Sequence, residues 1–184
     1  MHMKQLQLTL AILKPDVVKV PFVLKEIRHR ILSAGFYIVK NSEVTLSKEE
    51  AEKFYSEHAG RFFHNRLLTF MKSGPVQAYV LAHYDAINAW RKLMGPTKTY
   101  KSQFEDPSSI RGTFGLTDTR NSTHGSDSAG SALREIKFFF PSFDEDDWYR
   151  RTEPLLRNRD RITTDPLLSQ IIYPFSENGE RKCN

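Results

Sequence analysis

This sequence is short of cysteine and has no long apolar run. Its single cysteine, Cys183, excludes an intramolecular disulfide and a cysteine metal cluster, and it fits a protein from a reducing compartment. No apolar stretch approaches the roughly 20 residues that a membrane-spanning helix needs. The first residues contain neither the apolar core of a secretory signal nor an Arg- and Ser-rich presequence. We expect no membrane span and a cytoplasmic protein; the mitochondrion is the alternative, should a targeting segment precede Met1.

The composition indicates one globular domain with an excess of positive charge. Hydrophobic residues make up 39% of the 184 residues and aromatic residues 12%, which is enough for one buried core. The net charge of +5 favours a polyphosphate, a nucleic acid or an anionic membrane surface, although such a charge also simply keeps a protein soluble. There is no long Lys/Arg run and no glycine-aromatic RNA-binding signature, which argues against nucleic acid as the main partner.

The hydrophobic pattern alternates between strand-like and helix-like segments. Strands are predicted at residues 6–12, 37–44, 76–82 and 121–125. Helices are predicted at residues 21–34, 47–58, 62–72, 86–94 and 128–140, and a helical turn at 144–148. Residues 95–111 are predicted to form a long loop. This order of elements favours an α/β sandwich whose strands are covered on one face.

Individual residues define several of these boundaries. Ser47 and Glu50 have the spacing of a capping box, Gly35 is placed to end the first helix, and Asp85 is placed to cap another. In the helix at 128–140, the residues expected to face inward are Leu133, Ile136 and Phe140. From Arg150 the composition becomes charged and contains three prolines. We therefore divide the chain into a domain at residues 1–149 and a C-terminal extension at 150–184 that is partly packed or flexible, with residues 167–173 as a short strand or helix.

The most informative stretch is NSTHGSDS at residues 121–128, which surrounds His124 with small polar residues. Gly125 would let a ligand approach the backbone without a Cβ in the way. Lys14, Arg111 and Arg120 are candidates for an anionic site, and Glu135 is placed to orient the ring. The alternative is that His124 is an ordinary solvated histidine in a polar loop.

Three motifs together resemble nucleoside diphosphate kinases. They are Asn121–Ser128, the Ala-Ile-Leu-Lys-Pro-Asp run at residues 11–16, and Ile110-Arg111-Gly112. The resemblance covers about residues 8–148, and details at 94–97 and 115–121 look most like the divergent sixth type of animal members. It implies an α+β fold with a ferredoxin-like βαββαβ core and a four-stranded antiparallel sheet.

The resemblance also implies a role for each matching residue. His124 would be the nucleophile that carries the phosphoryl group, and Glu135 would hold its ring in one tautomer. The expected nucleotide and phosphate ligands are Lys14, Tyr55, Phe63, Leu67, Arg91, Thr97, Arg111, Asn121, Gly125 and Ser126. Phe63 is the expected base-stacking ring, with Phe62 as the alternative because the chain has one residue more here than the family pattern.

The expected partners are nucleoside di- and triphosphates, with Mg²⁺ as cofactor. Mg²⁺ would be held by the nucleotide phosphates and not by a dedicated protein site. Asp118 departs from the family, because it replaces a residue that is often apolar and lies beside the base. The segment between Gly95 and Arg111 is longer than usual around Lys101–Glu105, which leaves a homo-oligomer open and argues against the family's usual hexamer. The alternative function is a weakly active or inactive member that acts as a nucleotide-binding or protein-interaction module.

Overall fold

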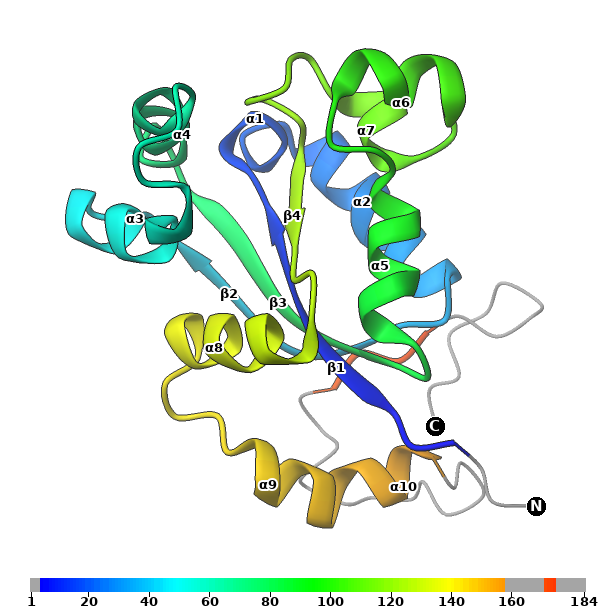
Figure 1. The fold of residues 1–184 in the computed structure, drawn as a ribbon. Helices are drawn as coiled ribbons and strands as arrows, with labels where there is room; N and C mark the ends of the chain where they lie inside the picture. The colour runs from blue at the N-terminus through cyan, green and yellow to red at the C-terminus, as the bar shows by residue number, and fades with distance from the viewer. Residues whose placement is uncertain (1–3, 158–170, 175–184) are drawn as a thin grey trace.

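A four-stranded antiparallel sheet forms the centre of the molecule (Figure 1). The computed structural model describes residues 4–157 and 171–174. The strands are β1 (Gln7–Leu13), β2 (Tyr37–Val44), β3 (Val76–His83) and β4 (Thr123–Gly125). Their order across the sheet is β2-β3-β1-β4, and each neighbouring pair is antiparallel. This confirms the ferredoxin-like α+β fold.

The helices occupy most of the positions that the hydrophobic pattern predicts. In chain order they are α1 (Pro15–Val18), α2 (Pro21–Ser33), α3 (Lys48–Phe54), α4 (His64–Met71), α5 (Ala86–Met94), α6 (Thr99–Glu105), α7 (Ile110–Phe114), α8 (Ala129–Phe139), α9 (Glu145–Asp147) and α10 (Glu153–Arg157). The helix predicted at 47–58 ends as an α-helix at Phe54 and continues as a 3₁₀ turn over Ser56–His58. The short helix α1 was not expected.

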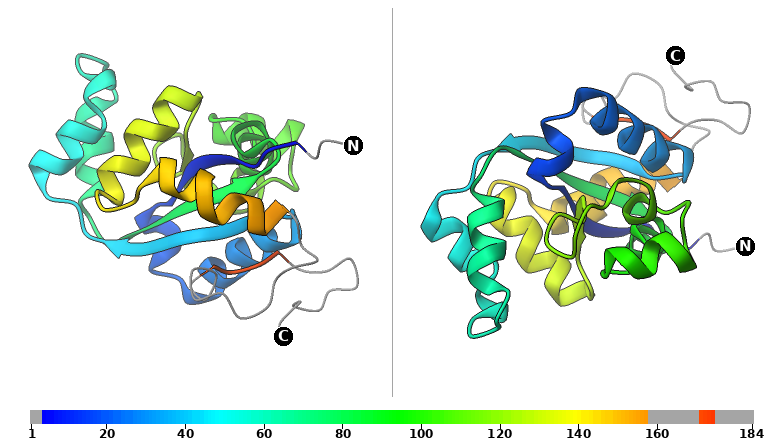
Figure 2. Two further views of the ribbon diagram at one scale, coloured as in Figure 1. Left: turned by 90° about the horizontal axis from the view of Figure 1, so that it is seen from below. Right: turned by 90° about the horizontal axis from the view of Figure 1, so that it is seen from above.

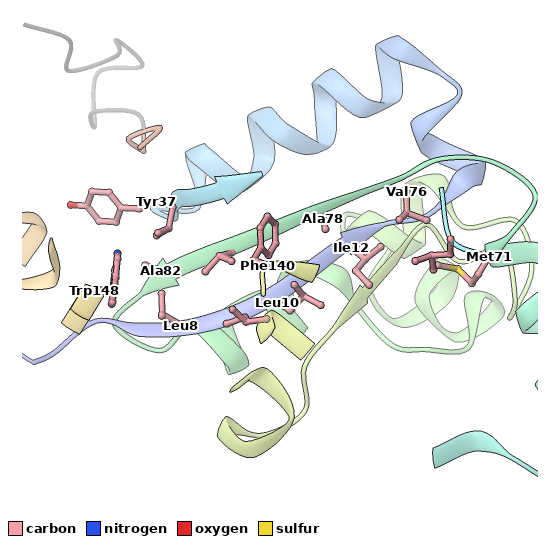
Figure 3. Close-up of a cluster of buried hydrophobic side chains, with 14 of the residues drawn as sticks. Leu8, Leu10, Ile12, Tyr37, Met71, Val76, Ala78, Ala82, Phe140 and Trp148 are labelled. Atoms are coloured by element: carbon pink, nitrogen blue, oxygen red, sulfur yellow. The ribbon is translucent and has the colours of Figure 1, made fainter. Parts of the chain in front are cut away.

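Both faces of the sheet are covered, so the prediction of one covered face is wrong. Because strand side chains alternate, Leu8, Leu10 and Ile12 of β1 enter one apolar cluster, whereas Ala11 and Leu13 enter a second. Figure 2 shows α2 in blue and α8 in yellow on opposite sides of the sheet. Figure 3 shows the cluster along β1 and β3 that also contains Trp148. Each large aliphatic side chain buried in this way contributes about 1.5–3 kcal/mol.

Two helix-boundary predictions are confirmed, a third is confirmed in position only, and the prediction that Leu133 faces inward is wrong. Ser47 and Glu50 form the capping box of α3, and Gly35 follows α2 with φ +85°. Asp85 stands at the N-cap of α5 but makes no side-chain bond to the helix backbone, because its carboxylate accepts from Nδ2 of the Asn88 side chain. Leu133 is 51% exposed, since the neighbouring positions on α8 already fill the inward face.

The segment at 95–111 is not a loop, and that prediction is corrected. It contains α6 and the start of α7. The backbone amide of Thr99 in α6 donates to Asp118 Oδ1 at 3.1 Å. Ser109 accepts from the amide of Gly112 and caps α7. The side chain of Asp118, from another segment, therefore stabilises α6, a helix that the local sequence does not predict.

The C-terminal part of the chain packs on the sheet where the structure describes it. The predicted turn at 144–148 is α9, and the chain continues through a π-helical turn at 148–152 into α10. Glu153 Oε1 accepts from the backbone amide of Leu6 at 2.9 Å. Ile172 pairs with Ile38 of the edge strand β2; of the element predicted at 167–173, residues 167–170 lie outside the described residues. The division at residue 149 stays a prediction. No helix in the described ranges combines the length and apolarity needed to cross a bilayer.

Candidate active site

A cleft of about 820 Å³ is lined by residues of β4, of α4 and the turn before it, and of the segment from α5 to α7. Figure 1 shows β4 between the α3–α4 pair and that segment. The cleft collects side chains from segments that are far apart in the sequence. The predicted site residues that line it are Lys14, Tyr55, Phe63, Leu67, Arg91, Thr97, Arg111, Asn121, His124, Gly125 and Glu135. Phe62 also lines it. Arg120, a candidate for the anionic site, lies instead against the ring of Phe70 in a neighbouring groove.

The imidazole of His124 is fixed through one nitrogen only. Its Nε2 lies 3.2 Å from Oε2 of Glu135, and its side chain is 19% exposed. Burial alone would raise the pKa of Glu135, but the hydrogen bond and charge of the His124 ring, together with Ser126, hold that pKa below its usual value. A carboxylate at Nε2 favours the tautomer that carries its proton there. Nδ1 is then the lone-pair nitrogen, and the described residues contribute no partner to it.

Ser126 lies behind Glu135 and does not line the cleft. Its hydroxyl donates to Glu135 Oε2 at 2.7 Å and accepts from the amide of Leu10 at 3.3 Å. It is fully buried. Ser126 therefore positions the carboxylate that binds the His124 ring. Its contact with a ligand stays a prediction.

The reason for glycine at position 125 is packing. A Cβ there would lie 2.5 Å from Nε1 of Trp90 and 2.8 Å from the terminal carbon of Met94. The indole of Trp90 in turn donates to the carbonyl oxygen of His124 at 3.1 Å. Gly125 thus allows α5 to approach β4 closely. The sequence does not predict this role of Trp90, because a tryptophan at helical spacing indicates only a core residue.

Two cations of the cleft are buried. Lys14 is 6% exposed, and its Nζ donates to Oδ1 of Asn121 at 2.7 Å. Burial, with the nearby charge of Arg111, lowers the pKa of Lys14 to about 7. The Arg111 guanidinium donates to the carbonyls of Gly95 and Thr123 at 2.8 and 3.1 Å. Burial and the charge of Arg91 lower the pKa of Arg111 to about 10, whereas the Arg91 side chain itself is exposed.

Aromatic rings form a continuous wall from the histidine to the mouth of the cleft. The ring of Tyr55 meets His124 edge-on at 6.1 Å and stacks on His58 at 6.1 Å. His58 contacts Phe63 at 5.5 Å, and Phe63 contacts Phe62 at the same distance. Phe63 is half-buried against the core, whereas Phe62 is 92% exposed. Burial raises the pKa of Tyr55, so its hydroxyl stays protonated. His58 had not been recognised as a cleft residue.

Asp118, the departure from the family pattern, has a structural partner. Its Oδ1 accepts a hydrogen bond from the backbone amide of Thr99 at the start of α6. The residue is exposed and also lines the cleft. Thr97 is exposed at the cleft, and its carbonyl accepts from Nδ2 of Asn121 at 3.0 Å. The longer segment is thus bonded to the stretch at 118–121 that precedes β4.

Comparison with known sequences identifies the family. The family model described as nucleoside diphosphate kinase matches residues 7–144. The chain belongs to the nucleoside diphosphate kinase family. Nucleoside diphosphate kinase 6 of Homo sapiens is 57% identical over 152 residues, which are 83% of this chain and 82% of that protein. The protein of the same name from Xenopus tropicalis is 51% identical over 154 residues, covering 84% and 86% of the two chains. The expected likeness to the sixth type is confirmed.

Solved structures of the nucleoside diphosphate kinase family share the fold. An orthorhombic crystal form of the Aquifex aeolicus nucleoside diphosphate kinase superposes with a TM-score of 0.71 at 39% identity, covering 73% of this chain and 95% of that chain. The apo enzyme from Encephalitozoon cuniculi gives a TM-score of 0.69 at 30% identity, covering 78% and 99%. Family and fold together support a nucleotide-binding kinase.

Proposed function

We propose that the chain is a nucleoside diphosphate kinase that moves the γ-phosphoryl group of a nucleoside triphosphate such as ATP to a nucleoside diphosphate through a phosphohistidine on His124. The observation that carries the proposal is the His124 ring itself. Glu135 holds its Nε2, Nδ1 is left to the cleft, and Lys14 and Arg111 supply positive charge nearby. A ring with this tautomer is a competent nucleophile near neutral pH.

The reaction occurs in two matching halves. Nδ1 of His124 attacks the γ-phosphorus, the N–P bond forms, the bond from phosphorus to the β–γ bridging oxygen breaks, and the diphosphate leaves with that electron pair. An incoming diphosphate then attacks the phosphohistidine, and the N–P bond breaks. Glu135 stabilises the positive charge that the ring acquires in the first half. Lys14, Arg91 and Arg111 offset the negative charge on the transferring oxygens.

The remaining cleft residues would bind the nucleotide. Phe63 and Leu67 would hold the base, because a stacked aromatic ring accepts any base. Asn121 would form a hydrogen bond with the sugar hydroxyl. Lys14, whose Nζ lies 2.7 Å from Oδ1 of Asn121, would contact the same hydroxyl. Tyr55, Thr97 and the Gly125 backbone would border the phosphates. Ser126 would act only through Glu135.

Mg²⁺ fits this cleft as an ion that arrives with the nucleotide. Among the described residues, no group of three or more His, Cys, Asp or Glu side chains could hold a metal. The exposed carboxylate of Asp127 lines the cleft, and hydrogen bonds from Ser131 and Ser128 help hold its pKa below the usual value. It would contact the ion through water. When bound, the ion neutralises phosphate charge.

The test is the formation of a phosphoenzyme. Incubation with γ-labelled ATP and Mg²⁺ should give an acid-labile adduct that a nucleoside diphosphate removes. The H124A variant should form none, and H29A, a histidine outside the cleft, should behave as the wild type. Failure of the wild type to form an adduct at millimolar ATP would contradict the proposal.

One observation favours the alternative of a weakly active nucleotide-binding or interaction module. Arg111 is 7% exposed, and two of its nitrogens are bound to backbone carbonyls, so less of its donor capacity is left for a phosphate. This alternative predicts nucleotide binding with negligible phosphate exchange, and partner binding that H124A leaves unchanged. The cytoplasmic location, with the mitochondrion as the alternative, stays a prediction. A homo-oligomer stays open, with the family's usual hexamer in doubt.

A further inference from the structure

Ser122, two residues before His124, has a backbone conformation that L-amino acids rarely adopt. Its φ is +70°, and it is the one non-glycine residue with a positive φ in the described part of the chain. The amide of Thr123 donates to the carbonyl of Asn121 at 2.8 Å, so the three residues form a γ-turn centred on Ser122. With a positive central φ this turn is the rare, strained form, and it persists only where the surroundings hold it.

The γ-turn changes which side chains face the cleft. In a straight strand, residues three apart such as Asn121 and His124 point to opposite faces. Here both line the same cleft. Asn121 bonds Lys14 and Thr97, while the His124 ring meets Glu135. The turn is therefore what allows the proposed sugar ligand and the proposed nucleophile to serve one nucleotide.

Two contacts from the junction of β1 and α1 hold the γ-turn. The amide of Lys14 donates to the carbonyl of Ser122 at 2.9 Å. The amide of Ser122 donates to Oδ2 of Asp16 at 3.1 Å. Asp16 is 8% exposed, and its Oδ1 has no partner among the described residues. Burial raises the pKa of Asp16, and the Ser122 amide followed by the Lys14 charge opposes that rise. A buried carboxylate is unfavourable unless it is hydrogen-bonded.

We propose that Asp16 is a positioning residue for phosphotransfer, because its carboxylate holds the γ-turn at Ser122 and so keeps Asn121 and the His124 ring on the same side of β4. Asp16 is not among the residues that line the cleft, so it acts through Ser122. The kinetic part of this proposal rests on the proposed kinase function; the structural part does not.

Three variants separate the hydrogen bond from the charge. D16A removes the acceptor and the charge, D16N keeps an oxygen acceptor without the charge, and D16A/S122G replaces Ser122 with a residue that adopts a positive φ without strain. In single-turnover reactions with labelled ATP, D16A should slow phosphorylation of His124 by about 10- to 100-fold, as loss of a positioning partner does elsewhere. Nucleotide binding by calorimetry should change much less. D16N and D16A/S122G should recover most of the rate.

Two results would overturn the proposal. If D16N is as slow as D16A, the negative charge beside Lys14 matters and the turn does not. If D16A/S122G folds, as thermal unfolding will show, and stays as slow as D16A, relief of the turn is irrelevant. Should D16A alone fail to fold, D16N and the double variant still decide the matter, since both are expected to be folded and active.

A spectroscopic measurement keeps this inference separate from the kinase proposal. The ¹⁵N signals of the His124 ring report whether Nε2 remains bonded to Glu135, and they need no turnover. D16A should shift or broaden these signals, and D16A/S122G should restore them. A wild type that forms no phosphoenzyme would refute the kinase proposal while this test still stands. Identical ring signals in D16A and the wild type would refute the role of Asp16 even in an active kinase.

Discussion

Glu135 Oε2 lies 3.2 Å from His124 Nε2 and 2.7 Å from the hydroxyl of Ser126. The first contact sets the tautomer of the ring and the second sets the position of the carboxylate. Because both contacts involve Oε2 of Glu135, replacing this carboxylate changes the contact of the His124 ring directly.

The E135Q variant should lose most phosphotransfer. The amide group can donate to Nε2, which moves the ring proton to Nδ1 and blocks the attacking nitrogen. A wrong tautomer in a comparable triad lowers the rate by about 10⁴-fold, and we expect a loss of the order of 10²-fold or more in single-turnover phosphorylation. E57Q, at an exposed glutamate of the same cleft, is the matched control. A near-normal rate in E135Q would show that the ring does not depend on this contact.

Nucleotide binding at pH 8 should be coupled to uptake of a proton by Lys14. The pKa of Lys14 is about 7, below the ordinary 10.5, so at pH 8 the free protein holds it mostly neutral. A bound polyphosphate favours the ammonium form and raises the pKa. Calorimetry in two buffers of different ionisation enthalpy measures the uptake. It should shrink toward pH 6, where Lys14 is already charged, and vanish in K14M. Equal uptake in K14M would assign the proton to another group.

The same shift predicts how stability depends on pH. Between pH 7 and 10.5 the unfolded chain keeps a proton on Lys14 that the folded protein releases. The free energy of unfolding therefore rises with pH between 7 and 10.5. Below pH 7 the folded protein bears the full cost of burying the charged ammonium of Lys14. In urea unfolding, the unfolding free energy of the wild type minus that of K14M should increase as the pH rises from 7 to 9. A constant difference would contradict the lowered pKa.

The G125A variant should be destabilised by about 1–3 kcal/mol, as overpacked cores are. Its new Cβ would overlap the Trp90 indole, which must move and release the carbonyl of His124. Urea unfolding measures the loss. G130A is the matched control, because a Cβ at Gly130 in α8 meets nothing within 4 Å and removes a helical glycine, so it should be neutral or stabilising. Equal stability of the two variants would refute the packing argument.

The F63A variant should weaken nucleotide binding more than F62A. Phe63 is held by His58 and the core, whereas Phe62 is 92% exposed. A ring that is already ordered loses less entropy when a ligand binds, and stacking on one base is worth about 1–3 kcal/mol. Equilibrium titration with a nucleoside diphosphate measures both variants. The reverse order would move the base-stacking role to Phe62.

The sequence predicts the elements whose signals are local. The strand at Tyr37–Val44 and the capping box at Ser47 agree with the structure residue for residue, because alternation and capping depend on neighbours in the chain. The cleft residues also come together as the three motifs imply, since those motifs resemble a family with this fold.

Features that depend on distant partners were missed. Helix α6 is bonded at its start to Asp118, which lies beyond the segment predicted as a loop. Gly125 is required by the indole of Trp90, 35 positions earlier in the chain. The pKa of Lys14 is lowered by its burial and by the charge of Arg111. None of these contacts leaves a periodic or local trace in the sequence.

The hydrogen bond from Trp90 to the carbonyl of His124 also makes the site visible to fluorescence. The chain has two tryptophans, and Trp148 belongs to the apolar cluster on the other face of the sheet. In a W148F background the remaining emission would come from the indole of Trp90, which is hydrogen-bonded to the backbone carbonyl of His124. Occupancy of the cleft could then be followed in real time, in unlabelled protein, at the residue where the chemistry is proposed.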